Sequence, residues 1–374
     1  MSIPIRAGQL WHDMLPEANH DDISRQGFVT TMMNTVGWMM DGNRTVYDKV
    51  VHPRFVKDEK REPRHVNEVR KVMLKQPYTQ YWSSFKRCAK EMQYESVGPM
   101  VERQLPELID KAEHYRTSNR KLGSLTLDPS IKAPRYNSEI EIHAKPGGYH
   151  TDLTENDVFA GAEFDRTYFV FTNGGTGADN GNAGRFMSAW MKKTLPDFKP
   201  KRILDMGCTI GGNTLPWKDA YPDAEVYGLD VAAPCLRYAH ARAEALGKKV
   251  HFVQDNAEAT RFEGESFDLV VSCIMMHELA HKAIHNVYAE AHRLLKPGGY
   301  TLHSDQTPFK HKDMVEQFHT DWDTHYQAEP FITSLGLLDL TEVAAKGGFQ
   351  KSKVREVLAP TGGGKPQFML FGQK

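Results

Sequence analysis

The residues best placed to do chemistry in this chain surround one glycine-bearing turn, residues 203–212 (ILDMGCTIGG). The apolar start predicts the end of a β-strand, and the glycines predict a turn that opens a helix. Glycine lets the backbone approach a ligand closely, and the first turn of a helix offers free N–H groups. The segment predicts a small-molecule site at the carboxyl edge of a sheet, a feature that many nucleotide-binding folds share.

An acidic residue follows this turn at an informative distance. Asp230 ends the next apolar run, Val226–Leu229, and lies 19 residues past Gly211. At that separation a carboxylate can accept hydrogen bonds from both hydroxyls of a ribose. The alternative is a surface aspartate that caps the helix after it.

A second candidate is the segment 277–281 (HELAH), which matches H-E-x-x-H. On a helix, His277 and His281 would share one face and could bind zinc, with Glu278 as general base. His285 would extend that face by another turn, but no Gly-x-x-His continuation follows. Its position directly after the apolar run 267–272 favours the edge of an organic active site. We therefore predict no metal site and keep a zinc hydrolase as an alternative.

The elements that must position these residues alternate between short apolar runs and helical stretches. Strands are expected at 202–206, 225–229, 250–254, 267–272 and 300–303, with helices near 185–195, 212–221, 234–246 and 282–295. Such alternation predicts an α/β fold with a parallel sheet covered on both faces. Two last runs, 353–358 and 367–371, are joined by the glycines 362–364, too few for a helical crossover. They predict an antiparallel hairpin.

Three further motifs follow in order: residues 253–258 (VQDNAE), 267–270 (FDLV) and 294–299 (LLKPGG). In this order and spacing, over about residues 185–305, the chain resembles the class I S-adenosylmethionine-dependent methyltransferases of small-molecule type. That family shows D-x-G-x-G-x-G, an acid ending the second strand, a Q-G-D-A-E-like turn, F-D-x-V and L-x-P-G-G. The resemblance implies a Rossmann-like seven-stranded sheet and S-adenosyl-L-methionine as cofactor.

The resemblance also implies contacts to that cofactor, carried over by position. The amino-acid end of the cofactor would be met by Asp205, Gly207, Cys208, Thr209 and Gly211, and its ribose by Asp230 and Val231. Its adenine would be met by Asn256 and Ala257, and its sulfonium by the segment that begins at Cys273. Thr209 stands where the family usually has its middle glycine, which costs backbone freedom. Asn256 stands where an aspartate commonly accepts from the adenine amino group, and an Asn side-chain oxygen can accept the same bond.

The chemistry implied is an in-line displacement at a methyl group, so the protein must mainly align the acceptor in a pocket closed to water. A hydroxyl acceptor also needs its proton removed, whereas a thiolate or an amine needs only desolvation. We predict His277 as the base, Glu278 as its partner and Asp305 as a residue facing the acceptor. The alternatives are a structural histidine and a turn or cap aspartate.

Three regions are expected. Residues 1–150 form a mainly helical N-terminal domain, because apolar positions recur at helical spacing in 28–40, 66–74 and 97–109; it would supply the substrate pocket, a dimer contact or both. Residues 151–184 combine aromatic residues with five glycines and form a lid or a linker; under a closed lid Arg185 would meet the cofactor carboxylate. Residues 185–374 form the catalytic domain, with a helical insert near 308–346.

Composition limits the function classes. The net charge of -1 argues against a nucleic-acid or membrane-surface partner, since both need a positive excess. No apolar run reaches the roughly 20 residues that span a bilayer. The four cysteines are scattered, which predicts reduced thiols and a cytoplasmic protein. We expect a methyltransferase acting on a small-molecule hydroxyl or thiol, with a homodimer possible; the alternative from another class is a catalytically silent cofactor-binding or scaffold protein.

Overall fold

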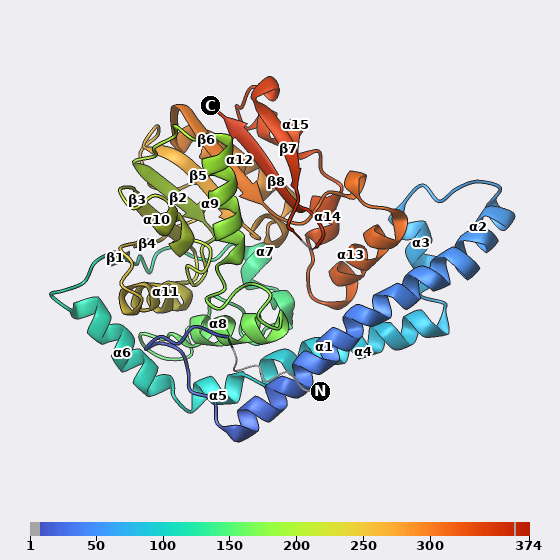
Figure 1. The fold of residues 1–374 in the computed structure, drawn as a ribbon, viewed down its shortest axis with the longest axis horizontal. Coiled ribbons are helices and arrows are strands. Elements are labelled where there is room, and N and C mark those ends of the chain that lie inside the picture. The colour runs from blue at the N-terminus through green and yellow to red at the C-terminus, as the bar shows by residue number, and fades with distance from the viewer. Residues whose placement is uncertain (1–7, 363) are drawn as a thin grey trace.

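A computed structural model describes residues 8–362 and 364–374. At its centre is an eight-stranded sheet of order β1-β4-β3-β2-β5-β6-β8-β7 (Figure 1). The strands are β1 (Ser124–Thr126), β2 (Arg202–Met206), β3 (Glu225–Asp230), β4 (His251–Gln254), β5 (Phe267–Cys273), β6 (Leu295–Ser304), β7 (Val354–Ala359) and β8 (Gln367–Gln373). The first six strands are parallel, whereas β8 is antiparallel to both β6 and β7.

Helices cover both faces of the sheet, as expected for strands that are apolar along nearly their whole length. One face packs against α9 (Asn182–Thr194), α10 (Leu215–Ala220) and α11 (Ala233–Ala245). The other packs against α12 (His281–Leu294), α14 (Ile332–Gly336) and α15 (Leu340–Lys346). The carboxyl ends of the central parallel strands share one edge, so the segments that follow them meet there.

The eighth strand is the element that the sequence did not predict. β1 lies in a segment expected to be a connection, yet it pairs in parallel with β4 at the edge of the sheet. A Cβ on Gly123 would lie 1.9 Å from the carbonyl oxygen of Val250, so glycine permits this close approach. A three-residue strand carries too short a pattern to be recognised. The predicted antiparallel hairpin of β7 and β8 is confirmed; Gly363, within its predicted glycine connection, lies outside the described residues.

The N-terminal region is helical, as predicted, and extends as an arm beside the catalytic domain (Figure 1). It contains α1 (His20–Val46), a π-helical turn (Tyr47–Val51), α2 (His52–Glu59), α3 (Val66–Met73), α4 (Pro77–Glu95), α5 (Gly98–Glu102) and α6 (Leu105–Thr117). One helix predicted over 97–109 is two, because Pro106 in the first turn of α6 cannot donate within a continuous helix. The insert after β6 supplies α13 (Met314–Tyr326), whose Phe318 and Trp322 pack on Trp82 of α4.

The aromatic segment expected to be part of a lid or linker forms a largely buried helix, α8 (Phe159–Phe171). Asp165 on this helix is 1% exposed. Its carboxylate accepts from the hydroxyl of Tyr238 at 2.9 Å and from Nε of Arg242 at 3.1 Å, both on α11. The same carboxylate accepts from Nδ2 of Asn180 at 2.8 Å and lies 3.1 Å from Nε2 of His12. One side chain therefore joins α8, α11, the glycine-rich loop and the N-terminal segment.

Among the helices of residues 8–362 and 364–374, none has both the length and the apolar character needed to cross a membrane.

Replacing Asp165 by alanine should lower the free energy of unfolding by about 3 kcal/mol or more, because Arg242 would be left buried without its counter-charge. Urea denaturation measures this change. The control is Asp58→Ala, which removes an exposed carboxylate 3.7 Å from Arg54 and should cost less than about 1 kcal/mol. Equal losses in the two variants would contradict the linking role of Asp165.

Candidate active site

The predicted glycine turn follows β2 and is fixed to β3 by its backbone. The N–H groups of Gly207 and Cys208 both donate to the carbonyl oxygen of Leu229, at 2.7 and 3.0 Å. Gly207 has φ +70°, and a Cβ there would lie 2.6 Å from the side chain of Met275. Thr209 also has a positive φ, +48°, a conformation that costs a non-glycine residue about 1 kcal/mol. The departure from the family pattern at this position therefore carries backbone strain.

Asp230 ends β3 beside this turn. One carboxylate oxygen accepts from the N–H of Thr209 at 2.9 Å and the other from the N–H of Ala232 at 3.0 Å. Since α11 begins only at Ala233, these bonds do not make Asp230 an ordinary helix cap. Each oxygen keeps a second lone pair, which is the capacity that two ribose hydroxyls would need.

Asp205 on β2 is buried, and its carboxylate accepts from the hydroxyl of Thr214 at 2.6 Å. Burial is the main cause that raises the pKa of this carboxyl to about 7; the Thr214 hydrogen bond opposes the rise and the charge of Asp230 adds to it. The Asp205 side chain thus ties the end of β2 to Thr214, beyond the turn. Cys208 and Cys273 are buried as well, and burial raises the pKa of both thiols well above their usual range, so both are neutral.

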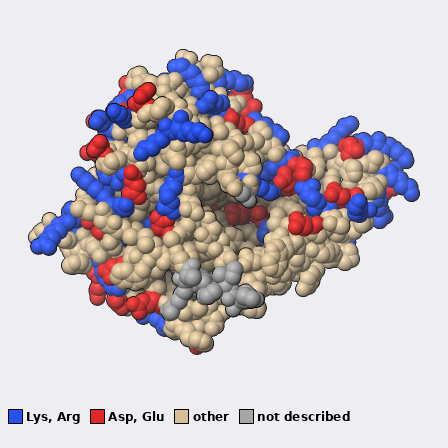
Figure 2. All heavy atoms as spheres, viewed as in Figure 1, with Lys and Arg blue, Asp and Glu red and all other residues tan. Residues whose placement is uncertain are grey.

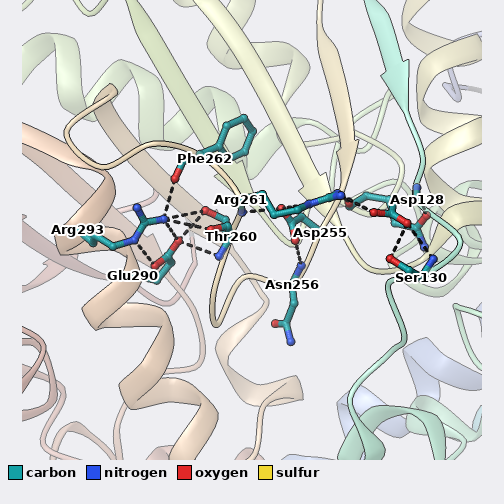
Figure 3. A network of polar contacts seen from close by, with 10 residues as sticks. Asp128, Ser130, Asp255, Asn256, Thr260, Arg261, Phe262, Glu290 and Arg293 are labelled. Carbon is teal, nitrogen blue, oxygen red and sulfur yellow. Dashed lines mark hydrogen bonds and ion pairs between the residues drawn. The ribbon is translucent and has the colours of Figure 1, made fainter.

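A polar network holds the turn after β4 (Figure 3). Arg261 binds the carboxylates of Asp255 and Asp128, the latter from the loop after β1. The N–H of Asn256 donates to Asp255 at 2.9 Å. Figure 3 shows the amide end of Asn256 pointing away from this network. That side chain is therefore presented by a fixed backbone, while Ala257 packs partly buried against the core.

A cavity of about 650 Å³ lies against β1, the end of β4, α6 and α11. Val231 and Gln254 line it together with Leu125 and Leu127 from the unpredicted edge strand and its loop. The amide nitrogen of Gln254 donates to the carbonyl of Val231 at 3.1 Å, which ties the two walls together. The lining mixes apolar side chains with polar and charged ones, among them Glu113, Arg116 and Arg237. Val231 directly follows Asp230, so a nucleoside with apolar and polar edges would fit beside that carboxylate.

The structure brings the three predicted catalytic residues together at the carboxyl edge of β5 and β6. Nδ1 of His277 lies 2.8 Å from Asp305, whose second oxygen accepts from the N–H of Met276 at 2.7 Å. Nε2 of His277 lies 3.2 Å from Glu278. Asp305 therefore orients His277 rather than facing an acceptor itself, which corrects the role expected for it.

Two residues of this cluster were missed by the sequence analysis. Nε2 of His143 lies 3.0 Å from Glu278 and 2.8 Å from Glu329. His143 comes from the predicted connection and Glu329 from the insert between α13 and α14; the N–H of His143 donates to the carbonyl of Ala328 at 2.9 Å. Neither residue belongs to a motif, so only the folded chain reveals them.

The cluster is strongly ionised. Burial lowers the pKa of His143, but the charges of Glu278 and Glu329 outweigh it and raise the pKa to about 9. Burial also lowers the pKa of His277, but the charges of Asp305 and Glu278 outweigh this effect and raise the pKa well above its usual range. The same imidazoles hold the pKa of Glu278 well below its usual range despite burial. The two imidazolium groups and the neighbouring carboxylates therefore stabilise one another's charged forms.

A series of aromatic side chains extends from His143 of this cluster. The rings of Tyr149 and Phe164 lie 5.7 Å apart, and those of Phe164 and Tyr168 stack at 5.2 Å. The hydroxyl of Tyr149 meets Nδ1 of His143. Burial, with the nearby Cys273, raises the pKa of Tyr168, which is therefore a neutral phenol. Figure 2 shows this face of the molecule hollowed near its centre, with acidic atoms deep in the hollow.

The zinc pair suggested by H-E-x-x-H is not formed. His277 and Glu278 lie in a 3₁₀ turn (Met276–Glu278), whereas His281 begins α12 and is exposed. The two histidines therefore do not share a helix face. His281 instead packs on His285, at 4.9 Å between ring centroids.

Arg185 lies near the start of α9 and is about half exposed. Its guanidinium donates to both oxygens of Asp179, at 2.6 and 2.8 Å, and to Asn182. Contact with a cofactor carboxylate would require this pair to open, and both that contact and the closing of the glycine loop stay predictions.

Comparison with known proteins agrees with the resemblance. Residues 203–299 match the family model described as a methyltransferase domain. This part of the chain is a methyltransferase domain. Over 102 residues the chain is 39% identical to the demethylmenaquinone methyltransferase of Thermus thermophilus, covering 27% of this chain and 44% of that protein. Over 103 residues it is 41% identical to the ubiquinone biosynthesis O-methyltransferase of Roseobacter denitrificans, covering 27% and 40%.

A solved structure, Haemonchus contortus phosphoethanolamine N-methyltransferase 2 in complex with S-adenosyl-L-methionine, is 24% identical. The match covers 47% of this chain and 38% of that one, with a TM-score of 0.38. The chain thus spans less than half the length of these relatives.

The raised pKa of Asp205 predicts a pH-dependent stability. Its carboxyl is neutral in the folded protein up to about pH 7 but ionises near pH 3.9 when unfolded, so wild type loses stability, by at most about 4 kcal/mol, as pH rises through that window. Asp205→Asn cannot ionise. The unfolding free energy of the variant minus that of wild type should therefore rise between about pH 4 and about pH 8. Urea titrations across this range measure it, and a flat difference would refute the raised pKa.

Proposed function

We propose that this protein transfers a methyl group from S-adenosyl-L-methionine to a hydroxyl oxygen of a small, ring-containing molecule. The observation that carries the proposal is the pairing of His277 with Asp305, at 2.8 Å, directly after the strand whose end lies beside the cofactor turn. A histidine oriented by a buried carboxylate is a recurrent means of removing a proton from a hydroxyl.

The cofactor site would be held by residues already described. Asp230 would accept from the ribose hydroxyls with Val231 beside it, Asn256 and Ala257 would border the adenine, and the turn at Gly207 would meet the amino-acid end. When bound there, S-adenosyl-L-methionine supplies an electrophilic methyl group on a good leaving group. Met275, which packs against Gly207, links this turn to the segment that carries His277.

The acceptor would lie between the cofactor turn and the cluster, against the rings of Tyr149, Phe164 and Tyr168. Flat aromatic walls favour a flat aromatic acceptor, which can stack on them and exclude water. The names of the two relatives, both from quinone biosynthesis, point the same way. The N-terminal region contributes Tyr94, Tyr149 and His143 to this pocket, which supports its expected part in substrate binding.

In this site His277 would take the proton of the acceptor after its own imidazolium, which Asp305 and Glu278 stabilise, has lost a proton, and Glu278 would be its partner. The Nδ1 side of His277 is occupied by Asp305, so Nε2 is the atom turned toward Glu278 and the pocket. Oε2 of Glu278 is buried and has no hydrogen-bond partner within residues 8–362 and 364–374. A hydroxyl that enters would find an acceptor there.

Asp230→Ala should weaken binding of S-adenosylhomocysteine about 100-fold, because two hydrogen bonds to a charged group are lost. Titration calorimetry on the full chain measures the dissociation constant. Asp223→Ala, an exposed carboxylate just before the same strand, is the control and should bind within about threefold of wild type. If the wild-type protein does not bind S-adenosylhomocysteine, the proposed cofactor is wrong and a catalytically silent scaffold protein is favoured.

His277→Asn should lower kcat toward a phenolic acceptor about 10²–10⁴-fold while the affinity for S-adenosylhomocysteine stays unchanged. The assay follows methyl transfer to a panel of phenols and thiols. A loss for phenols only supports oxygen methylation. If wild type prefers thiols and kcat falls less than about tenfold in His277→Asn, the acceptor atom is sulfur and not oxygen.

A further inference from the structure

The buried cluster has a property that proton transfer alone does not need: four potential metal-ligating groups converge on one point. His143, His277, Glu278 and Glu329 each offer one ligand atom, and these atoms all lie within 4.8 Å of one another. Three distances between imidazole nitrogens and carboxylate oxygens are 2.8, 3.0 and 3.2 Å. Metal bonds of about 2.0–2.1 Å in a tetrahedron place neighbouring ligand atoms about 3.3 Å apart, so small shifts would complete such a site.

Both imidazoles are fixed in the orientation that metal ligands require. Nδ1 of His277 is bound by Asp305 and Nδ1 of His143 by the hydroxyl of Tyr149. Each ring therefore directs Nε2 toward the centre of the cluster. A carboxylate or hydroxyl behind the far nitrogen of a ligating histidine is the usual outer contact of metal sites, because it fixes the ring and raises its basicity.

The carboxylates supply an independent observation. Oε2 of Glu278 and Oε2 of Glu329 are both buried, and neither has a hydrogen-bond partner within the described residues. Glu329 is only 7% exposed. A buried carboxylate oxygen without a donor is costly, and buried charges are normally paired or bound to a metal. These two oxygens belong to the same small cluster, where one cation could satisfy both.

We propose that His143, His277, Glu278 and Glu329 bind one divalent first-row transition metal ion. Two imidazoles, two carboxylates and no thiolate suit the borderline ions, of which Zn²⁺ is the closest match. This replaces the earlier expectation of no metal. Its use in catalysis rests on the proposed function with one change, since Nε2 of His277 would then be a ligand and not the base. The ion would lower the pKa of the acceptor hydroxyl and so favour loss of its proton to a carboxylate oxygen of the cluster.

The site differs from the H-E-x-x-H reading in a testable way. That reading needs His281, whereas the cluster uses His143 from the N-terminal region and Glu329 from the insert. His281 is exposed at the start of α12. It is the matched control, since both alternatives share His277 and Glu278 but only one needs His281.

The experiment is calorimetric titration of the full chain, stripped with EDTA, with Zn²⁺ alone, repeated with Co²⁺ while its visible absorption is recorded. We expect one ion per chain and the intense d–d bands of four- or five-coordinate Co²⁺. Glu329→Gln, which keeps size and shape, and His143→Asn should each weaken binding at least 100-fold. His281→Ala should bind as wild type does.

The outcomes separate the alternatives. If the wild-type protein binds no stoichiometric metal, the proposed site is wrong and the cluster is a network of ion pairs. If His281→Ala loses metal binding but Glu329→Gln does not, the metal belongs to the H-E-x-x-H segment. Unchanged circular dichroism and unchanged affinity for S-adenosylhomocysteine in Glu329→Gln exclude misfolding as the cause of a loss. If the protein binds Zn²⁺ but transfers no methyl group, the metal site stands and its role in catalysis is rejected. If metal-free protein transfers the methyl group, the proposed function stands and the catalytic role of the metal is rejected.

Discussion

The carboxylate of Asp165 is the interaction on which the active-site architecture depends. It is buried at the centre of α8 and neutralises Arg242 of α11, a helix packed directly on the sheet. Two residues earlier on α8, Glu163 forms a buried ion pair with Lys145, which belongs to the segment that carries His143. One helix therefore connects the methyltransferase sheet on one side to the cluster on the other. A misplacement of α8 would shift the aromatic wall and His143 together.

The parallel sheet determines what can meet at the site. Its strands all end at one edge, so the turn after β2, Asp230 after β3, Asn256 after β4 and His277 after β5 must face a common space. Residues 203–299 contain all of them and match the family model. By contrast, His143 and Glu329 come from outside this stretch and reach it only through tertiary contacts. The proposed cofactor half of the site thus comes from the domain that matches the family model, and the proposed acceptor half draws His143 and Glu329 from the rest of the chain.

The sequence predicted the parts of this structure that depend on short-range pattern. The bounds of β2 and the helices near 234–246 and 282–295 were found within about a residue, because apolar periodicity and glycine turns mark them locally. β1 was missed since three residues carry no period. α8 was taken for part of a lid because its aromatic residues are followed by glycines. The sequence predicted His277 and Glu278 of the cluster because they directly follow a strand. It did not predict His143 and Glu329, because their pairing is a long-range contact without a local signal.

Non-glycine residues with positive φ occur in each of the segments that supply the cluster. His143, Ala328 and Ile274 have φ values of +62°, +54° and +55°, and each precedes or carries a residue of the cluster. Non-glycine residues in this conformation cost of order 1–3 kcal/mol and persist only where surrounding contacts impose them. The Lys145–Glu163 pair and the hydrogen bond from His143 to Ala328 are such contacts. Three separate segments therefore hold unfavourable backbone in order to direct two imidazoles and two carboxylates at one point. Ion pairing alone would be satisfied by looser geometry, because charges attract over a range of distances, whereas metal coordination requires fixed directions.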